Sequence, residues 1–110
     1  MKIFKNYSFI IIISLSLIFF SSIVGQEGWY WQNPLPQGNN LHDVFFPFSN
    51  IGWAVGDYGT ILYSDNGGAS WVLQNSGTKN PLYSVYFTDA YNGWVVGLYG
   101  TILHTTDGGW

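Results

Sequence analysis

From position 29 onward, apolar and aromatic residues form runs of four to six, separated by clusters of Gly, Asn, Asp, Pro and Ser. Short runs bounded by turn-forming residues are typical of β-strands. No window of a dozen residues after Gly25 has a helical period free of Gly or Pro. The pattern therefore predicts an all-β protein with strands at Trp29–Gln32, Leu41–Phe46, Trp53–Val55, Thr60–Tyr63, Trp71–Gln74, Leu82–Phe87, Trp94–Val96 and Thr101–His104.

The first 25 residues follow a different pattern. Lys2 and Lys5 precede an apolar run from Phe9 to Phe20, and mostly smaller residues lead on to Gly25. This order is typical of a secretory signal peptide, and the apolar run is short for a membrane span. We expect a signal peptide at 1–25 and a mature, secreted, periplasmic or cell-surface chain at 26–110. A retained N-terminal anchor is the alternative.

The chain also repeats itself. Three pairs of similar segments lie 41 positions apart: Leu41–Phe46 and Leu82–Phe87, Gly52–Gly56 and Gly93–Gly97, and the identical Tyr58–Leu62 and Tyr99–Leu103. A fourth pair, Trp29–Asn33 and Trp71–Asn75, is spaced by 42. The repeat units are expected at about 29–70 and 71–110.

Four short antiparallel strands in a period of about 40 residues are typical of a β-propeller blade. The predicted fold is therefore about two four-stranded antiparallel blades of an incomplete ring. Segments 56–59 and 97–100 are short enough for hairpin turns, with Gly available for positive φ. Trp53 and Trp94 occupy the same place in the repeat, and we expect both to pack between adjacent strands or blades.

A second kind of turn begins at Ser64 and returns at Thr105. A short polar side chain such as Asn66 or Asp107 accepts hydrogen bonds from backbone N–H groups ahead of it, and a hydroxyl bonds back across the loop. Such a turn is rigid without a metal ion. The residues predicted to build it are Ser64, Asn66, Gly68, Trp71, Thr105, Asp107 and Gly109.

These residues resemble the Asp-box, or BNR, repeat Ser/Thr-x-Asp-x-Gly-x-x-Trp. In the first copy Asn66 replaces the usual Asp, and in the second copy Trp110 stands two positions early. Together with Gly-Trp-x-Val-Gly and Tyr-Gly-Thr-Ile-Leu, the box is similar to repeats of the photosystem II stability/assembly-factor-like propeller family. The resemblance implies a propeller fold and protein partners, and it suggests that the chain is a fragment of a longer protein.

Composition narrows the choice of partners. The chain has no Arg and no Cys, and residues 26–110 carry one Lys against six Asp and Glu, a net charge of −5. A mature chain with one Lys and no Arg is a poor match for nucleic acid or anionic lipid. Without Cys, neither disulfides nor a lipid-modified cysteine contributes to the mature protein.

We expect no enzymatic activity. Sialidases, which carry the same box, resemble one another in gripping a substrate carboxylate with arginines, and this chain has none. Asp43, Asp57 and Asp89 are the candidates for a glycosidase carboxylate pair. We interpret them as solvated acids in turns or at strand edges, because Asp43 aligns with Ser84 and Asp57 with Leu98.

No cofactor or metal is expected. His42 aligns with Tyr83 and His104 with Tyr63, which favours half-exposed strand residues over metal ligands. The segment Asp65–Gly68 lacks the alternating ligands of a calcium loop.

The predicted function is that of an exported, non-catalytic scaffold or protein-binding module. The alternative is a carbohydrate-binding or glycosidase-related surface protein. Trp29, Tyr30 and Trp31 cannot all face one side of a strand, so at least one of them is expected to be exposed or to contact a neighbour, and an exposed aromatic ring can stack on a sugar. Open sheet edges also predict self-association.

Overall fold

The computed structural model describes residues 28–32 and 36–110. The chain divides into two units, residues 1–32 and 33–110, and the sheets lie in the second unit. The first sheet contains four antiparallel strands in the order β1 (Leu41–Phe45), β2 (Gly52–Gly56), β3 (Ile61–Ser64) and β4 (Val72–Gln74). The second contains three, in the order β5 (Leu82–Phe87), β6 (Gly93–Gly97) and β7 (Ile102–Thr105). A single helical turn connects β2 to β3, namely η1 (Asp57–Gly59), and another connects β6 to β7, namely η2 (Leu98–Gly100).

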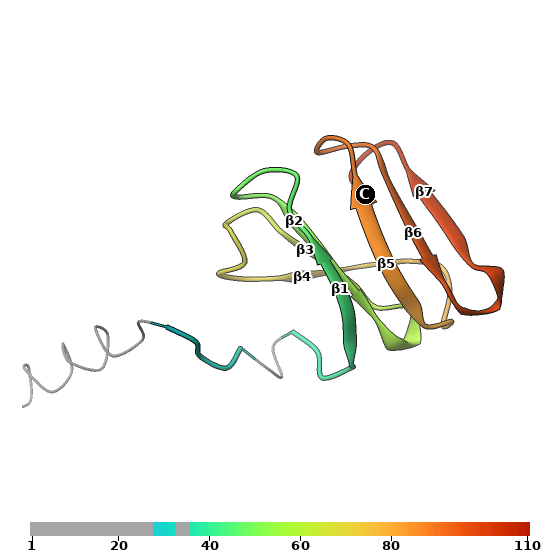
Figure 1. Ribbon diagram of the computed structural model, residues 1–110, viewed down its shortest axis with the longest axis horizontal. Helices are drawn as coiled ribbons and strands as arrows, with labels where there is room; N and C mark the ends of the chain where they lie inside the picture. Colours follow the sequence, from blue (N-terminus) through green and yellow to red (C-terminus); the bar gives the residue numbers. More distant parts are fainter. Residues whose placement is uncertain (1–27, 33–35) are drawn as a thin grey trace, which may run out of the picture. The chain divides into compact units, whose positions relative to one another are not determined.

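This architecture confirms an all-β fold of two successive antiparallel sheets (Figure 1). The strand predicted at Trp29–Gln32 is wrong, because these residues lie outside every strand. A strand exists only where a neighbour satisfies its backbone groups, and a suitable sequence alone does not supply that neighbour. The predicted signal peptide, residues 1–25, lies outside the described residues. In the described part of the chain, no helix has the length and apolarity needed to cross a membrane.

The register places the segment after the first box in the first sheet. Residues Val72, Leu73 and Gln74 of β4 pair with Tyr63, Leu62 and Ile61 of β3. Each sheet therefore begins with the strand that follows Asn40 or Pro81, and the box lies between the third and fourth strands of the first sheet.

The hydrophobic core lies between the two sheets, where β1 and β2 contact β5. On β2 and β5 its residues Trp53 and Val55, and Val85 and Phe87, lie two positions apart and so share one face of each sheet, although every residue of β2 is buried. Burial of each such side chain contributes about 1.5–3 kcal/mol. The cluster consists of Trp53, Val55, Leu82, Val85, Phe87 and Val95.

The two equivalent tryptophans differ in environment. Trp53 is 1% exposed and stacks on Phe87 of the other sheet, which confirms its predicted packing between blades. Trp94 is 40% exposed and stacks on His104 of the neighbouring strand β7, with ring centroids 4.7 Å apart. The packing of Trp94 is thus between strands, because within the described residues no third sheet covers the face on which it lies.

Candidate binding surface at the hairpin end

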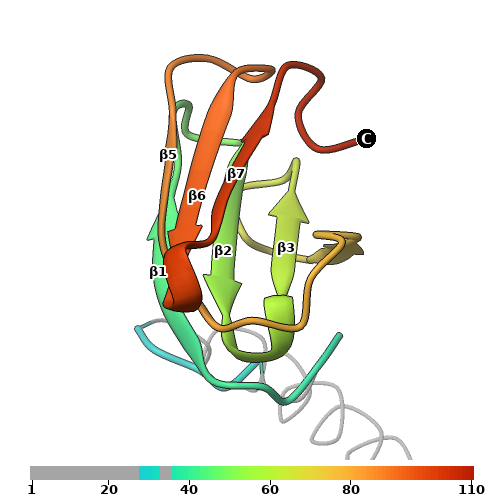
Figure 2. The same cartoon turned by 90° about the vertical axis from the view of Figure 1, so that its right-hand side faces the viewer.

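The β2–β3 and β6–β7 turns lie at the same end of the two sheets (Figure 2). Their central residues Tyr58 and Tyr99 have φ values of 57° and 59°, and the glycine after each also has positive φ. Two successive positive φ angles match the twist of a hairpin, but glycine, Asn or Asp usually occupies the first position. Tyr58 and Tyr99 are 73% and 81% exposed. In each turn, therefore, a tyrosine has a disfavoured backbone conformation and its side chain is exposed to water.

A β-bulge lies beside each of these turns. The pairing of β1 with β2 shifts between Leu41 and Asp43, which leaves His42 as the extra residue. The same shift in the second sheet leaves Tyr83. Bulges redirect side chains and recur next to binding sites. Here the His42 and Tyr83 rings meet edge to face, with centroids 4.9 Å apart.

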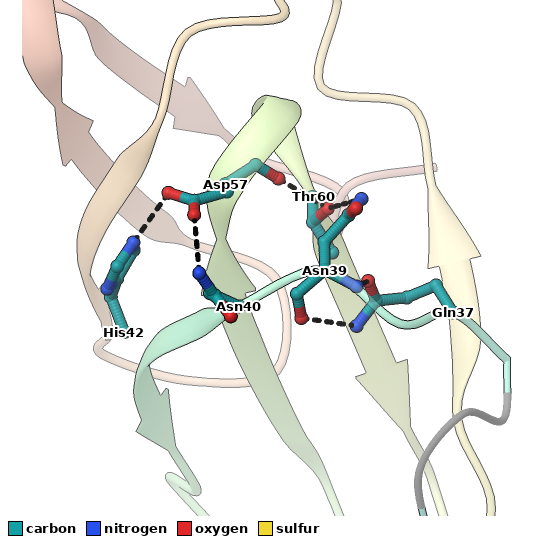
Figure 3. Close-up of polar contacts among 6 residues, drawn as sticks. All are labelled: Gln37, Asn39, Asn40, His42, Asp57 and Thr60. Atoms are coloured by element: carbon teal, nitrogen blue, oxygen red, sulfur yellow. Dashed lines mark hydrogen bonds and ion pairs between the residues drawn. The ribbon is translucent and has the colours of Figure 1, made fainter.

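Asp57, at the start of the β2–β3 turn, joins the bulge to the turn (Figure 3). Its Oδ1 lies 2.7 Å from Nε2 of His42, and its Oδ2 accepts a hydrogen bond of 3.1 Å from Nδ2 of Asn40. The hydrogen bond with His42, followed by the one from Asn40, holds the pKa of the Asp57 carboxyl below its ordinary value, against the opposing effect of desolvation. Asp57 is thus anionic throughout the neutral range.

The backbone around this cluster is the same in both repeats. The Asp57 N–H donates to the carbonyl of Asn40 over 2.9 Å, and the Leu98 N–H donates equally to the carbonyl of Pro81. A Cβ on the preceding Gly56 would collide with that Asn40 carbonyl, which explains the glycine of the repeated motif.

A side-chain hydrogen bond is repeated as well. Asn39 Nδ2 donates to the Thr60 hydroxyl over 3.0 Å, and Asn80 Nδ2 donates over the same distance to the Thr101 hydroxyl. In Figure 3, Gln37 lies beside Asn39 and hydrogen-bonds with its backbone. These polar contacts hold the loop that enters each sheet.

The side chains of Asn40, His42 and Asp57 are not part of that shared frame. Pro81, Tyr83 and Leu98 occupy the equivalent positions in the second sheet without any change in strand order or register shift. The fold therefore does not require the polar trio, and its presence on one sheet alone makes it the best candidate for recognition. We call the patch formed by His42, Asp57, Tyr58, Tyr83, Leu98 and Tyr99 the hairpin-end surface.

Most of the predicted box residues meet in two turns. In the first, the Ser64 hydroxyl donates to Oδ1 of Asn66 over 2.9 Å and accepts from the Gly68 N–H over 2.8 Å. Asn66 Oδ1 also accepts from the Ser70 N–H over 2.9 Å. Trp71 packs edge to face on Phe46, with centroids 5.8 Å apart.

The second box repeats these contacts with a carboxylate. The Thr105 hydroxyl donates to Oδ1 of Asp107 over 2.7 Å and accepts from the Gly109 N–H over 2.9 Å. The hydrogen bond from Thr105 is the largest cause of the lowered pKa of the Asp107 carboxyl, ahead of the desolvation that opposes it. In both boxes the polar groups hydrogen-bond to their own turn.

Asp43, Asp57 and Asp89, the candidates for a glycosidase carboxylate pair, each form hydrogen bonds with different partners in the fold. Asp43 Oδ2 accepts from the Val85 N–H over 2.9 Å, whereas Asp89 Oδ1 accepts from the Tyr91 and Asn92 N–H groups over 2.7 Å each. Within residues 28–32 and 36–110, His, Asp and Glu side chains form no group of three suited to a metal ion.

Sequence reasoning interpreted Asp57 as a solvated acid and His42 as a half-exposed strand residue, and it missed that the two side chains are in contact. The signal was present, because each differs from its counterpart at the same position of a repeat that is otherwise similar. The β-bulge that brings His42 to Asp57 could not be predicted from the repeat, so the contact was missed.

Two successive antiparallel sheets with a repeated hairpin frame and box turns define a segment of a β-propeller, and within residues 28–32 and 36–110 these sheets do not form a closed ring. The chain belongs to the family described as photosynthesis system II assembly factor YCF48, whose family model matches residues 23–110.

Solved structures give the same result. Eight chains match, among them YCF48 bound to D1 peptide, with a TM-score of 0.62 and 32% sequence identity. That match covers 67% of this chain and 24% of the solved chain, so the present chain spans about a quarter of its relative's length. The comparison with curated proteins gives no match.

Proposed function

We propose that this chain is an exported, non-catalytic scaffold segment whose hairpin-end surface binds a peptide segment of a partner protein. The observation that carries the proposal is the His42–Asp57 pair at the hairpin end, which the fold does not require and which lies beside exposed aromatic side chains. Membership in a family of assembly factors supports a binding role over catalysis. The similar solved structure, YCF48 bound to D1 peptide, supports a peptide as the ligand.

The residues of the hairpin-end surface have the chemistry of a peptide-binding patch. Tyr58, Tyr83 and Tyr99 offer flat apolar faces with a hydroxyl at the edge, a combination enriched at protein interfaces. His42 and Asp57 add a fixed acceptor and a ring nitrogen that orient polar groups of a ligand.

Charge defines the kind of peptide. The lowered pKa keeps Asp57 ionised at neutral pH, and residues 26–110 contain six Asp and Glu but only one Lys. Like charges across an interface are costly, so we propose a neutral or basic peptide with apolar side chains. The absence of Arg from the whole chain argues against a ligand recognised through its own carboxylates.

The decisive experiment replaces residues of the first repeat by their counterparts from the second. His42→Tyr with Asp57→Leu preserves a turn that the chain already builds elsewhere, so folding is retained. Peptides selected on the wild-type chain from a random display library should lose at least tenfold in affinity on this double variant. The control Tyr91→Ala removes an exposed aromatic side chain from the β5–β6 loop and should bind normally. Equal binding by all three proteins would refute the hairpin-end surface as the site.

Export and carbohydrate binding require separate tests. Mass spectrometry of the secreted chain should show an N-terminus near Gln26, and an intact Met1 would support the anchor instead. Carbohydrate binding remains the alternative, and glycan-array binding that persists when peptides do not bind would favour it over the peptide.

A further inference from the structure

The Asp57 carboxylate fixes which nitrogen of His42 carries a proton. Oδ1 of Asp57 lies 2.7 Å from Nε2 of His42, and an ionised carboxylate only accepts hydrogen bonds. The hydrogen bond with His42 is the largest cause of the lowered pKa of the Asp57 carboxyl, so the carboxylate is ionised at neutral pH. Nε2 therefore carries the proton. In the neutral ring, the other nitrogen, Nδ1, has a lone pair that accepts a hydrogen bond.

Nδ1 of His42 is the nitrogen that a ligand can reach. Within residues 28–32 and 36–110 it has no hydrogen-bond partner, and no unpartnered side-chain nitrogen or oxygen is buried there. In Figure 3 one ring nitrogen of His42 points at Asp57, whereas the other does not. The ring is held by Asp57 and by its edge-to-face contact with Tyr83. Nδ1 is thus an accessible acceptor with a fixed direction.

The surroundings of this acceptor favour a cationic donor. Within the part of the chain that the structure describes, Asp57 forms no ion pair with Lys79, the one Lys of residues 26–110. Its negative charge is therefore open to compensation by a ligand. Tyr83, whose ring contacts His42, is 45% exposed, and the face of an aromatic ring attracts a cation. A hydrogen bond from a charged donor is also stronger than one from a neutral donor.

We infer that Nδ1 of His42 accepts a hydrogen bond from the ammonium or guanidinium group of a basic side chain in the bound peptide. This inference rests on the proposed function and names the chemistry that the hairpin-end surface recognises. His42 determines the specificity, and Asp57 is a positioning residue that holds the ring and its proton. Tyr83 and Leu98 stand at the equivalent positions of the second sheet, so the imidazole–carboxylate pair occurs at the first sheet.

Binding should weaken in mild acid. Protonation of an imidazole converts Nδ1 from an acceptor into a donor and adds a positive charge, and both changes oppose a bound cation. The other groups around His42 are Asp57 of η1, the Tyr83 ring of β5 and Asp43, the next residue on β1, whose carboxylate accepts from the Val85 N–H. Carboxyl groups and phenols ordinarily titrate outside the range from pH 5 to 8, in which an imidazole changes its charge.

The test uses the full chain and peptides without His that are selected on it from a random display library. Each basic residue of a selected peptide is replaced in turn, Lys by norleucine and Arg by citrulline, which removes the charge and keeps most of the side chain. His42→Gln is the matched protein variant, because its amide N–H replaces the Nε2 donor to Asp57 and no atom replaces Nδ1. Tyr83 at the equivalent bulge shows that this position accepts other side chains.

We expect one replacement in the peptide to weaken binding to the wild type at least tenfold at pH 8. The His42→Gln chain should bind the original peptide at least tenfold more weakly than the wild type, and it should bind the original and the replaced peptide equally. Binding to the wild type should also weaken at least fivefold between pH 8 and pH 5, and binding to His42→Gln should not change. His104 is present in both proteins, so this difference reports on His42.

Three results would overturn the inference: selected peptides without any basic residue, a His42→Gln chain that binds like the wild type, or a wild-type affinity that is the same at both pH values. The last result needs no variant and holds even where His42→Gln does not fold. The double variant His42→Tyr with Asp57→Leu separates this failure from that of the proposed function. Binding that the double variant loses and His42→Gln retains leaves the hairpin-end surface as the site without this role for Nδ1, whereas binding that both retain refutes the surface itself.

Discussion

The indole of Trp53 on β2 lies flat on the ring of Phe87 on β5, with centroids 3.5 Å apart and an interplanar angle of 7°. The indole N–H also donates to the carbonyl of Gly108 over 3.3 Å, beyond the second sheet's last strand. One side chain of the first sheet thus contacts both the first strand and the final turn of the second. The interface between the sheets is centred on this residue.

Replacement of Trp53 should therefore be far more costly than replacement of Trp94. Trp53→Ala leaves a cavity between the sheets and should lower the free energy of unfolding by about 3–5 kcal/mol. Trp94→Ala, at the same repeat position, removes a half-exposed ring and should cost about 1 kcal/mol or less. Urea denaturation of both variants measures the difference. Equal losses would show that the two sheets are not packed through Trp53.

A carboxylate provides a second link between the sheets. Asp43 on β1 accepts hydrogen bonds from the Val85 N–H over 2.9 Å and the Ser84 hydroxyl over 3.3 Å, both on β5. Asp43→Ala leaves the Val85 N–H without its acceptor and should cost about 1–3 kcal/mol. Asp65→Ala, at an exposed position in the box turn, is the matched control and should change stability little. Equilibrium or kinetic unfolding that gives both variants the same loss of stability would contradict a stabilising link through Asp43.

The sequence predicted the strands well because each strand is a short apolar run bounded by turn-forming residues, and most of these runs recur in the second repeat. Seven of the eight predicted segments overlap observed strands, with small differences at their ends. Trp29–Gln32 was predicted on the same grounds and is wrong. Its sequence matches β4, but the pairing of a strand depends on a partner elsewhere in the chain, which a local pattern does not contain.

The site was harder to predict than the fold. The boxes were visible because their polar residues act within one turn. The contact between His42 and Asp57 depends on a bulge and on residues 15 positions apart. Likewise, positive φ at Tyr58 was not expected, because glycine stands next to it and tyrosine rarely adopts that conformation.

The first box should stabilise the chain through hydrogen bonds without calcium. Asn66 Oδ1 accepts from the Ser64 hydroxyl and the Ser70 N–H, so Asn66→Ala should lower the free energy of unfolding by about 1 kcal/mol. Asn66→Asp keeps the side-chain oxygen that accepts both hydrogen bonds and should retain most of that stability. Melting temperatures with calcium and with a chelator should coincide for all three proteins. A calcium-dependent increase that Asn66→Ala abolishes would identify a metal site instead.

The second box should make stability depend on acid, and the first should not. Asp107 accepts from the Thr105 hydroxyl and from the Gly109 and Trp110 N–H groups, and the Thr105 bond is the main reason that the pKa of its carboxyl is lowered in the folded state. The unfolded chain has the ordinary value of about 3.9, so the unfolded state binds the proton more readily. The stabilisation is therefore complete above that value and is lost as pH falls through the lowered folded pKa.

Asp107→Asn copies the first box, with an acceptor that does not titrate. Between pH 5 and 2, in the range about the ordinary carboxyl pKa of about 3.9, the melting temperature of this variant should fall less steeply than that of the wild type. The control Asp65→Asn removes an exposed acid of the other box and should leave the slope of the wild type unchanged, because Asp65 is not the acceptor of that turn. Parallel curves for all three proteins would show that the carboxylate of Asp107 gains nothing from its turn, and the hydrogen bonds of the second box would then hold the chain equally well around a protonated acid.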